Sequence, residues 1–100
     1  MLEWTLTGNL GRDPDNTKGA ARCTLCTNVQ VNNSRETKAV WVDLEATDIG
    51  TAAKLLDLKK GDGVMARGAV RINNYEHAGR MRTGWIMEIN QLHVTFIQDK

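Results

Sequence analysis

The sequence predicts an all-β fold: a five-stranded barrel with one short helix between the third and fourth strands. Most of the chain alternates apolar and polar side chains, which is the pattern of half-buried antiparallel strands. One segment near the middle has helical spacing instead. The 100 residues contain 41% hydrophobic and 25% charged side chains, the composition of a globular protein, and we expect a single domain over residues 1–100.

A loop separates the first two predicted strands. The first strand has an apolar face that consists of Leu2, Trp4 and Leu6. The segment Gly8–Gly19 is rich in Gly, Asp and Asn, and we expect a loop there. The second strand covers Arg22–Val31, with four inward side chains at Cys23, Leu25, Val29 and Val31. A polar turn is expected over Asn32–Thr37.

The third strand leads into the only predicted helix. The strand covers Ala39–Thr47, and its inward side chains are Val40, Val42, Leu44 and Ala46. Asp48 is expected to cap the helix, because its side chain can accept hydrogen bonds from free backbone N–H groups. The helix covers Ile49–Leu58, and its apolar face is predicted at Ile49, Ala52, Ala53 and Leu56. Two lysines and Gly61 follow, which are typical of a helix end.

Two further strands complete the barrel. The fourth has inward side chains at Val64, Ala66, Val70 and Ile72, and Gly68 allows close packing or a bulge. A hairpin tip is expected over Asn73–Arg80, and the fifth strand covers Arg82–Phe96. Three strands, a helix and two strands are the chain order of the OB-fold, whose sheet face and loops bind oligonucleotides.

Aromatic residues provide the candidate binding surfaces. Trp41 lies on the polar face of its strand, so either a nucleobase or a second subunit is expected to cover its ring. Tyr75, in the hairpin, either packs on its own barrel or stacks on a base. Trp85 can face either the core or the binding surface, and Trp4 is expected in the core or at an interface.

The charges of the chain are unevenly distributed. A formal net charge of +1 excludes a strongly cationic nucleic-acid coat protein. A cluster of arginines nevertheless lies near the hairpin: Arg67, Arg71, Arg80 and Arg82. Basic side chains that lead to an aromatic ring are typical of a groove that follows a single nucleic-acid strand. The alternative is a solvated face that keeps the protein soluble.

Other functional classes find little support in the sequence. No catalytic constellation and no phosphate-binding glycine loop is recognisable, so we do not expect an enzyme. Cys23 and Cys26 lie three residues apart on a strand and point to opposite faces, which argues against a metal site, and no cofactor is expected. The longest apolar run has four residues, so no membrane partner is expected. The start of the chain lacks a signal-peptide pattern, which predicts a cytoplasmic protein.

Four segments resemble the bacterial single-stranded DNA-binding proteins. Thr7–Pro14 is similar to their opening strand and turn, and Ala39–Trp41 is similar to their third-strand tryptophan segment. Ala53–Gly61 resembles their helix and its exit, and Val64–Arg71 resembles their fourth strand. The likeness runs from about Leu6 to Phe96.

This resemblance implies an OB-fold that assembles as a homodimer or homotetramer. It also implies binding of single-stranded DNA without sequence preference, in replication, recombination or repair. Carried over by position, Trp41 would stack on bases, Tyr75 would replace the hairpin tryptophan, and Arg71 would contact phosphate.

The chain also departs from this family. Asp43 stands where a basic residue is usual, Thr47 where a phenylalanine is usual, and Asn73 and Asn74 where a basic pair is usual. Each change removes a cation or a ring from the groove, which weakens the expected binding and its salt dependence. Proteins of this family usually carry a long tail with an acidic, hydrophobic tip, and no such tail follows Phe96. We therefore expect either a shortened chain or a tailless relative. An alternative function is therefore a protein-interaction module, an adapter for replication or recombination proteins with weak or lost DNA binding.

Overall fold

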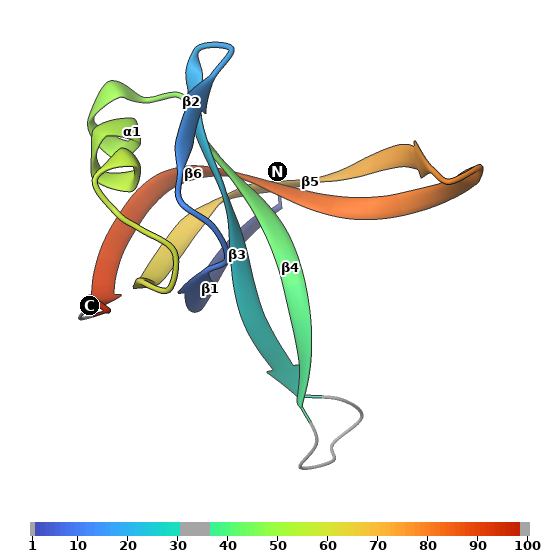
Figure 1. The fold of residues 1–100 in the computed structure, drawn as a ribbon, viewed down its shortest axis with the longest axis horizontal. Helices are drawn as coiled ribbons and strands as arrows, with labels where there is room; N and C mark the ends of the chain where they lie inside the picture. Colours follow the sequence, from blue (N-terminus) through green and yellow to red (C-terminus); the bar gives the residue numbers. More distant parts are fainter. Residues whose placement is uncertain (1, 31–36, 99–100) are drawn as a thin grey trace.

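The computed structural model describes residues 2–30 and 37–98, which form a strongly curved sheet with one helix at its side (Figure 1). The elements in chain order are β1 (Glu3–Leu10), β2 (Asp15–Thr17), β3 (Ala20–Gln30), β4 (Thr37–Ala46), α1 (Ile49–Leu56), β5 (Gly63–His77) and β6 (Arg80–Phe96). The predicted turn at Asn32–Thr37 lies outside the described residues, apart from Thr37, where β4 begins.

The sheet closes into a barrel. Its strand order is β1-β5-β6-β4-β3-β2, and β1 pairs a second time with β3, so the five longer strands form a closed ring. The pairing of β4 with β6 is parallel, and the other pairings are antiparallel. The predicted class, a five-stranded OB-fold barrel with one helix before the last two strands, is confirmed.

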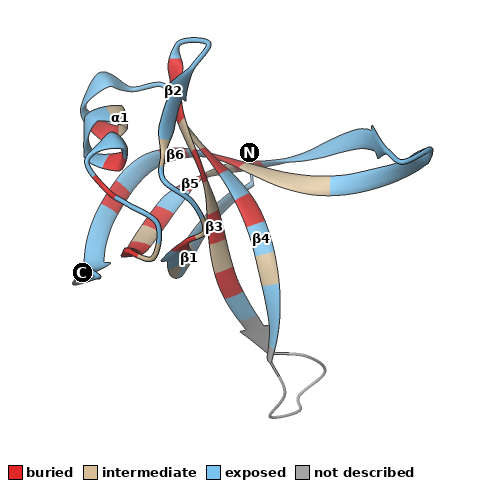
Figure 2. Ribbon diagram, in the orientation of Figure 1, coloured by how far each residue is buried: buried red, intermediate tan, exposed pale blue. Residues whose placement is uncertain are grey.

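The core follows from the alternation in the sequence. Inward side chains of all five long strands are buried, among them Leu10, Leu25, Val42, Leu44, Val64, Ala66, Met87 and Ile89. Figure 2 shows this burial as alternating bands along the strands around the barrel. At the helix, Asp48 Oδ2 accepts a hydrogen bond from the Thr51 backbone N–H at 3.0 Å, as predicted for the N-cap. No helix in the described part of the chain is long and apolar enough to cross a membrane.

Two boundaries differ from the prediction. The segment Gly8–Gly19 is not entirely loop, because β1 continues to Leu10 and the short β2 pairs with the start of β3. The helix ends at Leu56 rather than Leu58, and the Leu58 backbone N–H bonds the Leu55 carbonyl at 3.1 Å in a tighter turn.

The apolar face predicted for the helix was right only at Ala52, which packs against the core. Thr51 and Leu55 face the barrel and are buried, whereas Ile49 is 87% exposed and Leu56 is 39% exposed. The physical reason is that Thr51 is fixed by Asp48, to which its hydroxyl also donates at 3.1 Å. Thr51 and Leu55 are four residues apart and so lie on the same face of the helix, and this face points toward the barrel.

The β5–β6 hairpin extends far beyond the barrel (Figure 1). We call residues 71–86 the arm. The predicted hairpin tip at Asn73–Arg80 is mostly strand, and the turn itself is at Ala78 and Gly79, whose φ angles of 53° and 77° fit a two-residue turn of type I′. Ile72 was predicted to point inward, but it is 57% exposed because the arm has already left the barrel there.

Gly68 marks the start of this departure. The register between β5 and β6 shifts between Arg67 and Gly68, which confirms the predicted bulge. A β-carbon at Gly68 would overlap the carbonyl oxygen of Glu88, so only glycine permits this close approach of the two strands.

Candidate nucleic-acid interface

Trp41 lies on the outer face of β4. Its neighbour Val42 points into the core, and the indole is 57% exposed. The ring lies over Gly11 in the segment between β1 and β2, where a β-carbon would overlap the indole. The backbone at Gly11 therefore supports one side of the ring, and the ring can meet a ligand elsewhere on its surface.

The arm has two different faces. Residues directly opposite each other on paired strands share a face. From the register, one face carries Arg71, Asn73, Tyr75, His77, Arg80, Arg82, Gly84 and Ile86, and we call it the basic face. The opposite face carries Ile72, Asn74, Glu76, Met81, Thr83 and Trp85. All arginines of the arm thus lie on one face, and its carboxylate, Glu76, lies on the other.

Tyr75 lies on the basic face of the arm, and its ring is next to Gly84 of the paired strand. A β-carbon at Gly84 would be 3.2 Å from Tyr75 Cε1, so the absence of a side chain leaves room for the phenol ring. The tyrosine remains 46% exposed. The two exposed rings of the candidate interface, Trp41 and Tyr75, therefore each lie against a glycine.

A pocket of about 430 Å³ joins β4 to the arm. Its lining residues are Trp41, Asp43, Asn73, Tyr75, Thr83, Gly84 and Trp85. The structure thus brings together three of the aromatic candidates that lie far apart in the sequence. Trp85 contributes to the lining, but its ring packs against Trp4, with centroids 5.2 Å apart and planes tilted by 40°. Both of these tryptophans are half-buried, so Trp41 and Tyr75 offer the more accessible rings.

Carboxylates occupy part of the interface. Asp43 lines the pocket beside Trp41. Glu45 lies two residues beyond Asp43 on the same face of β4. Its Oε2 accepts hydrogen bonds from Arg22 Nη1 at 2.7 Å and from Arg71 Nη2 at 3.4 Å. The Glu45 side chain is only 14% exposed, so its charge is shared between two guanidinium groups close to the barrel wall.

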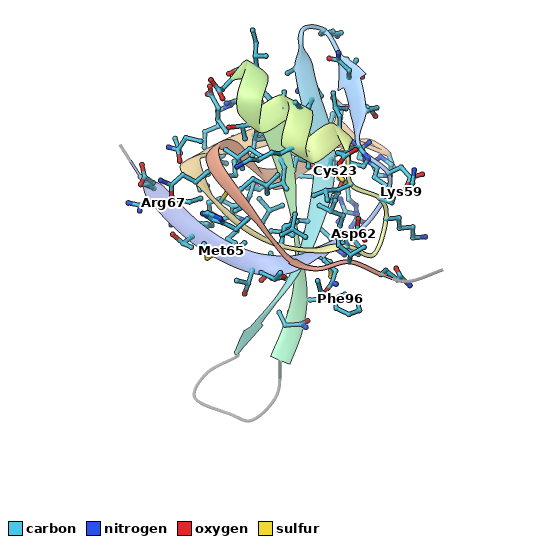
Figure 3. The ribbon with its side chains drawn as sticks, turned by 90° about the vertical axis from the view of Figure 1, so that its left-hand side faces the viewer. Cys23, Lys59, Asp62, Met65, Arg67 and Phe96 are labelled. Atoms are coloured by element: carbon cyan, nitrogen blue, oxygen red, sulfur yellow. The ribbon has the colours of Figure 1, made fainter. Side chains whose placement is uncertain are left out.

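The predicted arginines fall into three groups. Arg80 and Arg82 are exposed at the outer part of the arm and form no ion pair with any residue that the structure describes. Arg71 lies on the same face but contacts Glu45. Arg67 lies beside β1, where its Nε bonds Glu3 Oε1 at 2.6 Å, and it does not line the pocket (Figure 3).

The contacts of Gly11 and Gly84 with the two exposed rings were not predicted from the sequence. An isolated glycine in a strand pattern is a signal of close backbone approach, and Gly84 gives that signal between Thr83 and Trp85. Gly11 lies in a predicted loop, where a glycine has an ordinary explanation as a turn residue. The contact of Gly11 with Trp41 depends on the closure of the barrel, so the sequence around Gly11 does not predict it.

The cysteines lie in different environments. Cys23 is buried, its Sγ donates to the Arg12 carbonyl at 3.0 Å, and burial raises the pKa of its thiol. Cys26 is half-exposed and lies opposite Trp41 on the neighbouring strand. In the described ranges 2–30 and 37–98, no group of three or more His, Cys, Asp or Glu side chains is placed to hold a metal ion.

Comparison with known proteins gives matches in structure. No family model and no curated protein matches the sequence. The fold is similar to that of a small single-stranded DNA-binding protein from Streptomyces coelicolor, with a TM-score of 0.77 at 15% identity over 94% of both chains. A mitochondrial single-stranded DNA-binding protein from S. cerevisiae gives a TM-score of 0.77 at 11% identity over 97% of both chains. An SSB of Plasmodium falciparum, solved in complex with ssDNA, gives 0.66 at 24% identity over 98% of this chain and 96% of that one. The chain therefore has the SSB-like OB-fold that these bacterial, mitochondrial and Plasmodium proteins share.

Proposed function

We propose that the chain binds single-stranded DNA without sequence preference, through base stacking on Trp41 and Tyr75. The observation that carries this proposal is the pocket in which both rings meet, at the inner end of the basic face of the arm. Stacking on an aromatic side chain contributes about 1–3 kcal/mol per base and tolerates any base. We infer that this binding serves DNA replication, recombination or repair in the cytoplasm.

Arginines of the basic face would hold the phosphates. Arg80 and Arg82 are exposed, whereas Arg71 must first leave Glu45. Each phosphate contact to a single strand contributes a slope of about −0.7 to the plot of log K against log salt. With two or three contacts, we expect a slope between roughly −1.4 and −2.1. Arg67 is left out of this set because Glu3 holds it beside β1.

The test is a titration of tryptophan fluorescence with thymidine oligonucleotides at low and moderate salt. Trp4 and Trp85 pack on each other, so Trp41 is the most exposed of the three indoles. Quenching should be strong in the wild type and largely lost in Trp41→Phe. Tyr75→Ala should weaken binding by about 5- to 150-fold, the equivalent of one base stack. Met81→Ala is a matched control, because Met81 is 70% exposed on the opposite face of the arm.

Two results would contradict this function. One is the absence of binding at low salt by a folded protein, as judged by circular dichroism. The other is unchanged affinity in both Trp41→Ala and Tyr75→Ala. In either case the rings of the pocket have another use.

Asp43 favours a second candidate function, a protein-interaction module. Its carboxylate lines the pocket beside Trp41, where it repels phosphate but suits a contact with a basic peptide or a donor group. Asp43→Arg separates the two functions. If the wild type does not bind oligonucleotides and Asp43→Arg does, the acidic pocket has closed the groove to DNA. If Asp43→Arg binds DNA more weakly than the wild type, Asp43 belongs to a working DNA site.

Self-association is a further part of the proposal. Apolar side chains are exposed at the base of the arm and beside it: Leu2 at 54% and Ile72 at 57%. The Leu2 carbonyl accepts a hydrogen bond from Val70 at 3.0 Å, which places Leu2 next to the base of the arm. A second copy of the chain would cover such a surface. Light scattering on the wild type and on Ile72→Asp tests this, and a wild type that stays monomeric would contradict it.

A further inference from the structure

A row of paired residues runs around the outside of the barrel from Trp41. Trp41 is opposite Cys26, Cys26 is opposite Asn9, Asn9 is opposite Gly63, and Gly63 is opposite Phe96. Directly opposite residues share a face of a sheet, so this row follows one continuous outer surface across five strands. It leads away from the arm and ends at Phe96, which is 58% exposed.

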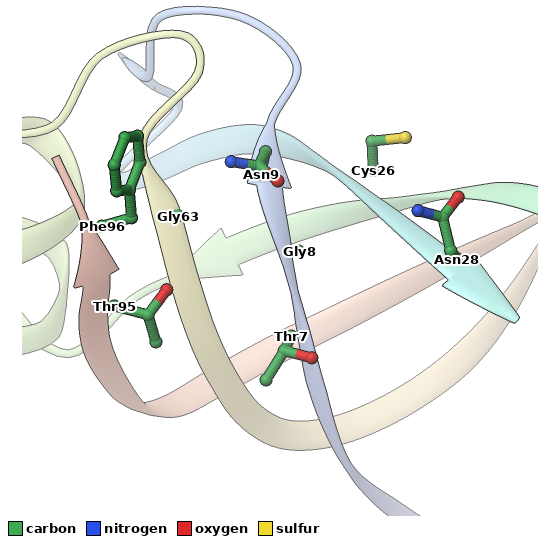
Figure 4. Close-up of a pocket in the computed structure, with 8 residues that line it drawn as sticks. All are labelled: Thr7, Gly8, Asn9, Cys26, Asn28, Gly63, Thr95 and Phe96. Atoms are coloured by element: carbon green, nitrogen blue, oxygen red, sulfur yellow. The ribbon is translucent and has the colours of Figure 1, made fainter. Parts of the chain in front are cut away.

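A hollow of about 370 Å³ lies along this row (Figure 4). Two of its lining residues, Gly8 and Gly63, are glycines. A β-carbon at Gly63 would be 2.8 Å from Thr95 Oγ1, and one at Gly8 would overlap the Cys26 carbonyl oxygen. The two glycines therefore permit the close approach of the strands that line the hollow.

The walls of the hollow are polar and uncharged. They include the side chains of Thr7, Asn9, Asn28 and Thr95, and none of the described residues that line the hollow is acidic or basic. Asn9 Nδ2 donates to the Gly61 carbonyl at 2.9 Å, which fixes the amide and leaves Oδ1 as an acceptor. The pocket at Trp41 differs in this respect, because it contains Asp43.

Phe96 is held in place by the turn before β5. Asp62 is buried, with 4% of its surface exposed, and its Oδ1 accepts the backbone N–H of Gln98 at 3.0 Å. The other oxygen accepts the backbone N–H of Lys59 at 2.8 Å. The backbone is therefore held two residues after Phe96, which reduces the main-chain freedom that would be lost when a ligand binds there.

We propose that this hollow is a second nucleotide subsite, in which a base of the same DNA strand stacks on Phe96. An exposed aromatic ring beside neutral amide and hydroxyl groups suits a nucleobase, which is uncharged and has donors and acceptors on its edge. The proposal rests on the proposed function, because it extends the path of the strand that Trp41 and Tyr75 bind.

The row also sets the length of DNA that reaches both sites. Trp41 and Phe96 are separated by four strand spacings of about 4.8 Å, or roughly 19 Å of barrel surface. Binding sites on OB-folds cover about 4–16 nucleotides. A short oligonucleotide would occupy one site, and a longer one would occupy both.

The first experiment measures affinity against length, with thymidine oligonucleotides of roughly 4 to 16 nucleotides. Phe96→Ala should weaken binding of the long oligonucleotides by about 5- to 150-fold, the equivalent of one lost base stack. Ile97→Ala is the matched control, because Ile97 is also 58% exposed but does not line the hollow. Equal affinities of Phe96→Ala and Ile97→Ala for the longest oligonucleotide would overturn the subsite.

The second experiment uses Cys26, which lies on the row between the two sites. Cys23 is buried, so N-ethylmaleimide should modify Cys26 alone in the folded protein. In the wild-type protein, a long oligonucleotide should slow the modification of Cys26, as measured by intact mass. An unchanged rate at saturating long oligonucleotide would overturn the proposal.

The outcomes separate this proposal from the proposed function. If the wild type binds through Trp41 and Tyr75, but Phe96→Ala binds normally and Cys26 reacts at its usual rate, only the second subsite fails. If the wild type binds no oligonucleotide at low salt, both proposals fail.

Discussion

The indole of Trp41 lies against the backbone of Gly11, so closely that a β-carbon at that glycine would overlap its six-membered ring. Gly11 has no positive φ angle that would require a glycine, and the close approach of the ring is the physical reason for the residue. The segment between β1 and β2 thus sets the position of the most exposed tryptophan in the candidate interface.

Gly11→Ala should therefore weaken oligonucleotide binding without unfolding the protein. The added methyl group must displace either the ring of Trp41 or the segment that supports it. We expect a loss of affinity no larger than that of Trp41→Ala, measured by titration with a thymidine oligonucleotide. The double variant is the control: it should bind as Trp41→Ala does, because the glycine acts through the ring. Additive losses in the double variant would contradict this coupling.

Two adjacent leucines of α1 provide a test of the helix orientation. Leu55 is fully buried, whereas Leu56 is 39% exposed. Leu55→Ala should lower the free energy of unfolding by about 2–5 kcal/mol, because it leaves a cavity against the barrel. Leu56→Ala should cost less than about 1 kcal/mol, because little of its side chain is removed from contact with the core. Denaturant unfolding measures both, and equal losses would mean that the helix packs through another face.

The strand pattern was predictable because burial alternates with period two along most of the length of the barrel strands. Leu25, Val42 and Val64 follow that rule directly. The rule fails where the chain leaves the barrel: Ile72 keeps the inward parity of Val70, but no opposing layer covers it in the described chain. A sequence pattern reports which face a side chain takes, and it does not report where the core ends.

The candidate site was predictable only in part for a similar reason. Trp41 was identifiable because a large ring on a polar strand face is unusual, and Tyr75 because of its place in the hairpin. Their meeting in one pocket depends on the parallel pairing of β4 with β6, a long-range contact. The capture of Arg67 by Glu3 likewise joins residues 64 positions apart.

The N-cap of the helix predicts a pH dependence of stability. Hydrogen bonds from Thr51 lower the pKa of Asp48 below its ordinary value. A lowered pKa in the folded state means that the charged cap stabilises the fold above the unfolded pKa, and that this contribution is lost as the pH falls through the folded pKa. The melting temperature of the wild type should therefore fall more than that of Asp48→Asn between neutral pH and pH about 2. Parallel curves for the two proteins would contradict a role for the charge.

Glu45 keeps two arginines away from a bound phosphate. Its Oε2 forms ion pairs with Arg22 Nη1 at 2.7 Å and with Arg71 Nη2 at 3.4 Å, and the Glu45 side chain is only 14% exposed. Arg71 is also the innermost cation of the basic face of the arm. A phosphate that binds Arg71 must therefore compete with the carboxylate of Glu45, and this competition weakens the charge contact at the inner end of the groove.

Glu45→Gln should consequently bind single-stranded DNA more tightly than the wild type. The neutral amide releases Arg71, and one more phosphate contact should steepen the plot of log K against log salt by about 0.7. Glu3→Gln is the matched control: it releases Arg67 beside β1, away from the pocket, and should change the slope less. Affinities measured over a salt series give both quantities. Weaker binding by Glu45→Gln would mean that Glu45 orients Arg71 for the phosphate rather than competing with it, since a held guanidinium needs less ordering on binding.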